Sequence, residues 1–284
     1  MTKLYSSQDP EETKDEVNRL QLQHELIEAF CNGLVKAPID LTRAGQRILD
    51  SATADGYWMR RMQTIMPPGT EFVGFDILPV VQHPGNPFPP QIKTVLRSVL
   101  DPFPAEWTNA YDLVHQRLLL VLFSDEEVAR ILQGLISCVK PGGWIQLFEG
   151  SGKRLHDPRA KYFGTFYDLA ARKLQNIEVG ARLGESLRKA GLVNIHHETV
   201  DFNIGCSNPD RELGAKGAEN ILSIIHMWQN ETGKTQLTVA SREEIGLSEE
   251  EWENLGRLAL QDMRTYRTEM RYHIVWAQKP VAGL

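Results

Sequence analysis

The chain has 284 residues, of which 42% are hydrophobic, and it carries a formal net charge of -6 at pH 7. This length and composition are sufficient for one large domain, or for one domain with a substantial addition, to bury a core. The negative charge argues against general binding to a nucleic-acid backbone, which requires clustered lysine and arginine side chains. We therefore expect a globular chain without a nucleic-acid partner.

The cysteines and the apolar runs indicate the compartment. Cys31, Cys138 and Cys206 lie far apart, without the spacing of metal ligands, which is typical of reduced residues in a cytosolic protein. The longest strongly apolar run, Leu118 to Phe123, is too short to cross a bilayer, and no basic-then-apolar signal sequence opens the chain. We expect a soluble, cytoplasmic protein with no metal site and no membrane partner.

A helix is expected ahead of the first strand. Thr13 and Glu16 have the spacing of a capping box, and apolar residues follow them at helical intervals. Because this helix is an addition to the sheet, residues 1–45 are predicted to form a helical lid segment and residues 46–284 the main domain. Two arrangements stay open, since the helix could cover its own sheet or pair with a second copy in a homodimer.

Strand and helix patterns then alternate along the chain. Short apolar runs predict strands at Ile48–Leu49, Phe72–Phe75, Thr94–Val99, Tyr111–Val114 and Trp144–Phe148, within 193–204 and at Tyr272–Ala277. Helix starts are predicted near Asp55 or Gly56, at Ser124 with Glu127, at Asp157 with Pro158, at Leu183 and at Ser248 with Glu251. This alternation predicts an α/β fold with a doubly wound, mostly parallel sheet covered on both faces, and a helical insertion at about 205–245.

Four loops follow the carboxyl ends of consecutive predicted strands. In open α/β sheets this edge is where ligands bind. The loops are Asp50–Gly56, Asp76–Leu78, Ser98–Leu100 and His115–Arg117. Any one of them could be a mere connection, but their common order along one edge favours a binding site.

The loop after the first strand has the pattern of a tight strand-to-helix turn. Asp50 is followed by small residues that end at Gly56. Nucleotide-binding turns of this kind usually carry three glycines, whereas Ala52 and Ala54 stand at the first two glycine positions here. Asp76 ends the second strand, 26 positions beyond Asp50, where an acid can accept both hydroxyls of a ribose. The pattern indicates a nucleotide-like ligand, although an ordinary connection explains the first loop alone equally well.

Two strings carry a resemblance to a known family. The residues YDLVHQRLLL at 111–120 and VKPGGWIQL at 139–147 resemble class I S-adenosylmethionine-dependent methyltransferases. More narrowly, the chain is similar to the LaeA-like small-molecule methyltransferases of fungal secondary metabolism, from about residue 17 to residue 280. The Lys-Pro-Gly-Gly turn is shared by many methyltransferases, whereas the His-Gln-Arg block is more selective. The resemblance implies a seven-stranded Rossmann-like sheet with added helices forming a lid.

The resemblance also implies a reaction and a cofactor site. The reaction is transfer of a methyl group from S-adenosylmethionine to an O, N or S atom of a small natural product, with S-adenosylhomocysteine as the second product. The first loop would lie beside the methionine part of the cofactor, Asp76 would hold the ribose, Ile77 would pack on the adenine, and the His-Gln pair would line the substrate mouth. The implied cofactor-binding positions are Asp50, Ser51, Ala52, Asp76, Ile77, Ser98, Val99, Leu100, His115 and Gln116.

Two departures from the family pattern concern this site. Alanine at positive φ costs roughly 1 kcal/mol relative to glycine, so the turn with Ala52 and Ala54 either uses ordinary dihedrals or is slightly distorted. Ser98 stands where the family usually has an aspartate that bonds the adenine amino group, and a neutral hydroxyl is a poorer acceptor. Neither departure removes the ribose acid, so cofactor binding is still expected.

Chemistry and substrate contacts are expected from a few further residues. Because the sulfonium methyl is already activated, alignment of donor and acceptor is the main task, and a base helps only where the acceptor must lose a proton. His115 is the first candidate for that base, and the alternative is that it fixes the loop by hydrogen bonds. The predicted substrate-binding residues are His24, Tyr162, Phe163, Phe166, His226 and Trp228. Aromatic residues at helical spacing are more often core than pocket, so both interpretations stay open.

Two other functions compete with methyl transfer. The altered glycines and Ser98 are compatible with a cofactor-binding homologue that transfers nothing, either a cyclase of the pericyclase type or a regulatory interaction protein. A nicotinamide-dependent oxidoreductase is less favoured, because it would prefer the intact three-glycine turn and leaves the Lys-Pro-Gly-Gly block unexplained.

Overall fold

The computed structural model describes residues 10–77, 88–230 and 239–281. The chain forms two compact units, each assembled from segments that are distant in the sequence. One, called the sheet unit below, comprises Cys31–Ser151, Glu178–Val200 and Tyr272–Leu284; the other, the helical unit, comprises Met1–Phe30, Gly152–Ile177 and Asp201–Arg271.

A seven-stranded sheet organises the fold, with the strand order β3-β2-β1-β4-β5-β7-β6. Neighbours from β3 to β5 pair in parallel. Gly142 N–H donates to the Lys279 carbonyl at 2.8 Å, and Lys279 N–H donates to Gly143 O at 2.9 Å, so the end of β7 lies beside the start of β5 and the two strands are antiparallel. The strands are β1 (Arg47–Ser51), β2 (Glu71–Asp76), β3 (Ile92–Leu96), β4 (Tyr111–Arg117), β5 (Val139–Arg154), β6 (Val193–Ile204) and β7 (Thr268–Gln278). The predicted α/β fold is confirmed.

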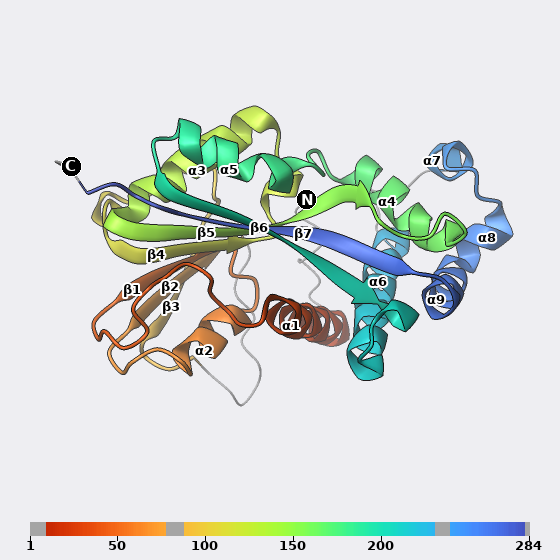
Figure 1. The fold of residues 1–284 in the computed structure, drawn as a ribbon, viewed down its shortest axis with the longest axis horizontal. Helices are drawn as coiled ribbons and strands as arrows, with labels where there is room; N and C mark the ends of the chain where they lie inside the picture. Colours follow the sequence, from red (N-terminus) through yellow and green to blue (C-terminus); the bar gives the residue numbers. More distant parts are fainter. Residues whose placement is uncertain (1–9, 78–87, 231–238, 282–284) are drawn as a thin grey trace. The chain divides into compact units, whose positions relative to one another are not determined.

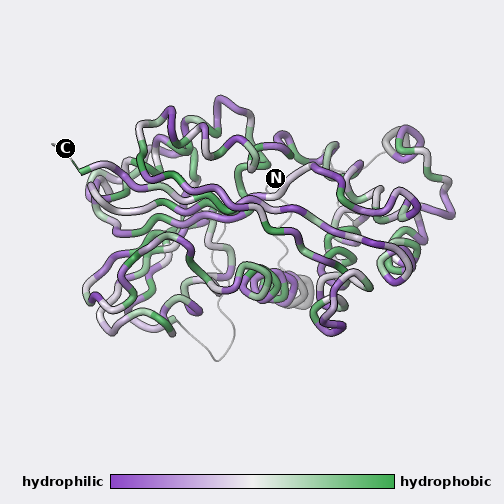
Figure 2. The backbone as a smooth tube through the Cα atoms, in the orientation of Figure 1, coloured by the Kyte–Doolittle hydropathy of each residue, from purple (hydrophilic) through white to green (hydrophobic). Residues whose placement is uncertain are grey.

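Helices cover both faces of the sheet in the sheet unit. Figure 1 shows α2 (Tyr57–Gln63) on one face and α3 (Asp125–Cys138) with α5 (Val179–Lys189) on the other. The central strands carry short apolar runs that are buried on both faces, and Figure 2 shows hydrophobic residues among them. The side chains with 0% exposure in these strands include Ile48, Leu49, Phe72, Tyr111, Leu113 and Val114.

The helical unit consists mainly of helices and includes the outer ends of β5, β6 and β7. α9 packs against both α4 and α6 in this unit. Its helices are α1 (Pro10–Cys31), α4 (Lys161–Lys173), α6 (Arg211–Asn230), α7 (Val239–Glu244), α8 (Glu249–Glu253) and α9 (Leu255–Thr265). The predicted insertion at about 205–245 covers α6 and α7, and its residues 231–238 lie outside the described part of the chain. No helix of the described residues has the length and apolarity that a membrane span requires.

Several predicted boundaries are wrong by a few residues. The helix expected at Asp157 begins at Lys161, because Asp157 O accepts from Ala160 N–H in a tight turn. The capping box of Ser248 forms, but its helix ends at Glu253 and a second one starts at Leu255. The predicted start of the first helix at Thr13 is also too late, since α1 begins at Pro10, and the Thr13 side chain lies outside the described atoms.

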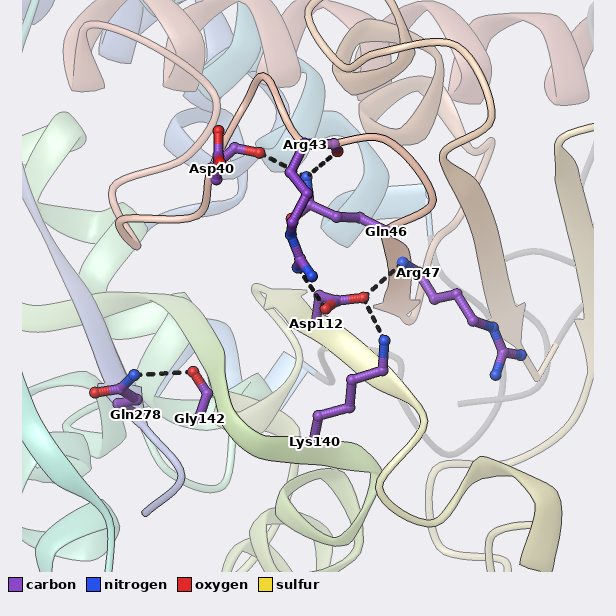
Figure 3. A network of polar contacts seen from close by, with 8 residues as sticks. All are labelled: Asp40, Arg43, Gln46, Arg47, Asp112, Lys140, Gly142 and Gln278. Atoms are coloured by element: carbon purple, nitrogen blue, oxygen red, sulfur yellow. Dashed lines mark hydrogen bonds and ion pairs between the residues drawn. The ribbon is translucent and has the colours of Figure 1, made fainter. Parts of the chain in front are cut away.

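A network of charged and polar groups closes the amino edge of the central strands (Figure 3). Asp112 at the start of β4 is 8% exposed, and its carboxylate accepts from Arg43 Nη2 at 2.6 Å, from Arg47 N–H at 2.9 Å and from Lys140 Nζ at 2.7 Å. Beside it, Gln278 Nε2 donates to the Gly142 carbonyl at 2.8 Å. These contacts tie β1, β4, β5 and β7 together at the edge opposite to the predicted ligand site.

Candidate functional site

The turn between β1 and α2 lies at the carboxyl edge of the sheet. Ala52 and Ala54 adopt left-handed backbone angles, with φ of 54° and 51°, and Gly56 follows with φ of 71°. Of the two alternatives open from the sequence, the turn therefore does not use ordinary dihedrals. A left-handed conformation costs a residue with a Cβ roughly 1–2 kcal/mol, so the two alanines make this a strained turn.

Contacts with β2 hold the strained turn in place. Thr53 N–H donates to Phe75 O at 3.0 Å, and Ala54 N–H donates to Asp76 Oδ2 at 3.0 Å. Gly74 permits this close approach, because a Cβ there would come within 2.9 Å of the Thr53 side chain. The predicted ribose acid thus also supports the loop beside it.

Asp50 and His115 are register partners on the adjacent strands β1 and β4. His115 Nδ1 lies 2.8 Å from Asp50 Oδ1, and the Thr53 hydroxyl donates to Asp50 Oδ2 at 2.6 Å. The imidazole stacks on Trp58 of α2, with ring centroids 3.7 Å apart and an angle of 5° between the planes. Trp58 Nε1 in turn donates to the Leu34 carbonyl at 3.3 Å. This cluster joins two strands, the turn and the following helix.

Burial decides the charge of His115, which is 1% exposed. Burial lowers the pKa of the imidazole below its usual value, although the hydrogen bond and the charge of Asp50 act in the opposite direction. At pH 7 the ring is therefore neutral. Because the Asp50 carboxylate accepts a hydrogen bond from Nδ1–H, the lone pair of the ring lies on Nε2. A neutral histidine oriented by a carboxylate is an arrangement that general bases use.

The loop after β3 places a carboxylate beside Ser98. Asp101 Oδ2 accepts from Ser98 N–H at 3.1 Å, and Ser98 Oγ accepts from Leu100 N–H at 3.1 Å. Arg97 anchors the loop, since its N–H donates to the Asp76 carbonyl at 2.8 Å and its Nη2 donates to Asp101 O at 3.2 Å. The weaker acceptor expected at Ser98 therefore has an exposed acid next to it.

Other predicted cofactor positions differ widely in exposure. Ile77, directly after Asp76, is 59% exposed, which leaves a face of its side chain for a flat apolar group. Val99 is buried at 9% exposure. Ser51 and Gln116 are fully buried at 0%, so they can shape the site from beneath but present no side-chain surface to a ligand.

The predicted substrate-binding residues all lie in the helical unit. Phe166 of α4 stacks on Trp228 of α6, with ring centroids 5.1 Å apart, and both are 7% exposed. Phe163 is 0% exposed in α4. His24 of α1 is 1% exposed, with Nε2 3.4 Å from Glu28 Oε2. The aromatic residues are packed among other side chains in this unit, as the core interpretation expects.

Two members of that set reach the surface of the helical unit. The Tyr162 hydroxyl is 3.0 Å from Glu251 Oε1, to which Lys161 Nζ also donates at 2.7 Å. His226 is exposed on α6 and lies against Gly256 of α9, where an added Cβ would come within 2.6 Å of its Nε2. The set therefore divides into a packed aromatic group and a polar surface group.

Sequence reasoning missed several residues of this edge as site residues. They are Thr53, Trp58, Asp101 and Glu149. Glu149 is the clearest case, because an acid directly after the apolar run Trp144–Phe148 was a visible signal at the carboxyl edge. It is 0% exposed and accepts from Gln116 Nε2 at 2.7 Å. Among the described residues no group of three or more His, Cys, Asp or Glu could hold a metal ion.

The amino-acid sequence is similar to those of known methyltransferases. A family model described as "Methyltransferase domain" matches residues 22–197. N-methyltransferase verN of Clonostachys rogersoniana is 36% identical over 93% of this chain and 90% of its own length. N-methyltransferase sirN of Leptosphaeria maculans is 32% identical over 93% of this chain and 92% of its length, and N-methyltransferase gliN of Aspergillus fumigatus is 30% identical over 93% and 94%.

Solved structures with low sequence identity are similar to this chain in fold, and the similarity extends no further. A methyltransferase candidate from Bacillus halodurans C-125 superposes with a TM-score of 0.51 at 16% identity, covering 93% of this chain and 100% of that chain. Phosphoethanolamine N-methyltransferase 2 of Haemonchus contortus, solved with S-adenosylhomocysteine, has a TM-score of 0.50 at 15% identity, and the match covers 92% of this chain but only 52% of that chain.

Proposed function

The chain belongs to the methyltransferase domain family and is an S-adenosylmethionine-dependent methyltransferase, and from that premise we propose that its methyl acceptor is a nitrogen atom of a small natural product. The observation that carries the proposal is the similarity, over nearly the whole chain, to relatives that are named N-methyltransferases. A nitrogen acceptor is the one choice among O, N and S that agrees with all of these names.

The cofactor site that we propose is the carboxyl edge of β1, β2, β3 and β4. Asp76 would hold the ribose, and the exposed side chain of Ile77 would cover one face of the adenine. The left-handed turn at Ala52 would approach the methionine part, and the Ser98–Asp101 loop would face the adenine amino group. An acid next to an exposed apolar side chain fits a ligand with both a sugar edge and a flat base.

In this reaction the cofactor supplies an activated methyl group on a sulfonium. Transfer of that methyl group to a nitrogen lone pair would give S-adenosylhomocysteine and a proton as the other products. Holding donor and acceptor in line is worth about 7–11 kcal/mol, which places the main demand on positioning.

We propose that His115 acts chiefly by positioning. Its imidazole is 1% exposed and is held by Asp50 on one side and Trp58 on another. An amine acceptor loses its proton readily once methylated, so no base is required for it, whereas an amide nitrogen would need one. The general-base alternative predicts that His115→Gln removes an acidic limb from the pH–rate profile, and positioning predicts a lower rate with the profile unchanged.

We propose that the substrate-binding residues are those of the predicted set, His24, Tyr162, Phe163, Phe166, His226 and Trp228. Tyr162 and His226 are the members of the predicted set at the surface of the helical unit, so they would contact the acceptor. Phe163, Phe166 and Trp228 would shape the wall behind them, and His24 would act from α1. We propose the N-terminal segment 1–45, of which residues 1–9 lie outside the described part of the chain, as a lid segment or as the contact of a homodimer, and light scattering of the purified protein tests for the dimer.

The cysteines support a reducing compartment. Cys31 and Cys138 are buried free thiols, and Cys206 is an exposed free thiol. We place the enzyme in the cytoplasm on this basis, and a fluorescent fusion in the producing cell tests that placement.

The experiment for the proposed function is incubation with S-adenosylmethionine carrying a ¹³C-labelled methyl group and a metabolite extract of the source cells. The expected product carries the label on nitrogen, which its carbon chemical shift identifies. Label on oxygen or sulfur would overturn the nitrogen assignment. Tight S-adenosylhomocysteine binding without any labelled product would favour the non-transferring homologue instead.

A further inference from the structure

Three fully buried polar side chains line up beneath the proposed cofactor site. Ser51 of β1, Gln116 of β4 and Glu149 of β5 are each 0% exposed. Ser51 and Gln116 are register partners, and Gln116 is the partner of Leu147, two residues before Glu149. Because side chains alternate along a strand, all three lie on one face, opposite to the face of Asp50 and His115.

One carboxylate oxygen of Glu149 accepts hydrogen bonds from the segment that follows β4. Its Oε1 accepts from Gln116 Nε2 at 2.7 Å, from Leu119 N–H at 3.0 Å and from Leu120 N–H at 2.9 Å. Leu118, at the start of this segment, has a left-handed φ of 50°. Such a conformation is costly for a leucine, so the segment needs fixed partners to keep it.

Burying these three polar side chains lowers the free energy of unfolding. Gln116 Oε1 and Ser51 Oγ are buried atoms with no hydrogen-bond partner among the described residues, whereas the Val121 N–H also stabilises the Glu149 carboxylate. A buried polar atom without a partner destabilises a fold. Burial also raises the pKa of Glu149 to about 7, against the opposing effect of the N–H groups that it accepts from. Costly groups of this kind tend to persist where function needs them.

We propose that Glu149 is a positioning residue for methyl transfer, which holds the segment Leu118–Leu120 and the end of β4 in the geometry that the cofactor requires. Through Gln116 it acts on the strand that also carries His115, without touching the cofactor itself. This inference rests on the proposed cofactor site at the ends of β1, β2 and β4.

The test compares Glu149→Leu, which removes the acceptor, with Glu149→Gln, which keeps an oxygen acceptor at the same place. The readouts are the Kd for S-adenosylhomocysteine by calorimetry, measured well below the Tm of each variant, and the separate kcat and KM. We expect Glu149→Leu to raise the Kd about tenfold or more and Glu149→Gln to restore most of the affinity. Wild-type affinity and kcat in folded Glu149→Leu would overturn the proposal.

A matched control separates positioning from stability. Asp112, at the other end of β4, is also a buried carboxylate with three donors, Arg43, Arg47 and Lys140 (Figure 3). Asp112→Leu should lower the Tm as Glu149→Leu does but leave the Kd unchanged. An equal loss of affinity in both variants would mean that Glu149 acts only through global stability, against the proposal.

Two further variants keep the test decisive. If Glu149→Leu does not fold, Leu118→Gly loosens the same segment and relieves the left-handed backbone, so the proposal expects a folded protein with a weaker Kd, and an unchanged Kd overturns it. Asp76→Ala in the same assay tests the cofactor site itself. Lost affinity in Asp76→Ala together with wild-type affinity in Glu149→Leu would refute only the role of Glu149, whereas wild-type affinity in Asp76→Ala would refute the proposed site.

Discussion

Ala52 occupies a backbone conformation that glycine adopts without strain. Its φ is 54°, and the cost relative to glycine is about 1 kcal/mol. We expect Ala52→Gly to raise the free energy of unfolding by up to about 1 kcal/mol, measured by urea denaturation. Ala190→Gly is the matched control, because Ala190 has an ordinary φ of -78° and glycine there should destabilise. A loss of stability in Ala52→Gly would contradict the strain at this turn.

Asp76 serves the turn and, in our proposal, the ribose. Its Oδ2 accepts from Ala54 N–H at 3.0 Å. We expect Asp76→Ala to raise the Kd for S-adenosylhomocysteine at least tenfold, about 1.4 kcal/mol, with Asp76→Asn in between because an amide keeps one acceptor. Glu71→Ala, at the exposed other end of β2, should bind as wild type. Calorimetry measures all three, and unaltered binding by Asp76→Ala would remove the ribose role.

Glu149 makes stability depend on pH in a definite direction. Burial raises its pKa to about 7 in the folded state, from 4.5 for an ordinary glutamate. The folded state therefore binds the proton more tightly, and the stability from this group is complete below about pH 4.5 and is lost as the pH rises to about 7. A shift of this size corresponds to roughly 3 kcal/mol.

The measurement for this effect is the difference in unfolding free energy between wild type and Glu149→Gln across that pH window. Because glutamine does not titrate, the free energy of unfolding of the variant should increase relative to that of the wild type as the pH rises from about 5 to about 8. A difference that stays constant with pH would show that Glu149 is not protonated in the folded protein.

At the scale of secondary-structure elements, local capping explains some helix starts. Ser124 accepts from Glu127 N–H at 3.3 Å, and Glu127 Oε2 accepts from Ser124 N–H at 3.0 Å. We expect Ser124→Ala to destabilise the protein by about 1 kcal/mol. Ser248→Ala removes the equivalent capping box of the short helix α8 and should cost less, because few residues follow that cap. Thermal unfolding of both variants tests this order, and the reverse order would contradict it.

Other helix boundaries depend on distant residues. α4 begins at Lys161, and its first free N–H groups, those of Tyr162 and Phe163, donate to Asp262 Oδ2 at 2.6 and 3.1 Å. The cap therefore comes from α9, far along the sequence, and no local pattern at Asp157 reveals it. The break between α8 and α9 has a local cause, since Asn254 Nδ2 donates to Glu250 O at 2.9 Å and ends the first helix.

At the scale of the whole molecule, the net charge of -6 opposes non-specific binding to nucleic acids. Binding to duplex DNA depends on releasing counterions with clustered cations, and we expect no shift of a DNA fragment at low or physiological salt in a gel assay. A fragment that binds and is released by salt would contradict this expectation.

Patterns in the amino-acid sequence were enough to predict the order of strands and helices along the chain, the α/β class, the family and the acids at two strand ends. These follow from local patterns, because an apolar run between turn residues defines a strand wherever it lies, and Asp50 and Asp76 stand directly after such runs. Boundaries set by local groups, such as the Ser124 cap, were accessible in the same way.

Which side chains meet depends on the packing of the whole chain and could not be predicted from local patterns. The stacking of Trp58 on His115, the three donors on Glu149 and the cap that Asp262 gives to α4 all join residues far apart in the chain. The packing of the whole chain also decided that Ala52 and Ala54 take left-handed angles, since contacts with β2 outweigh their local preference. Burial has the same origin, because a histidine or a glutamate changes its pKa only when the rest of the chain removes water from around it.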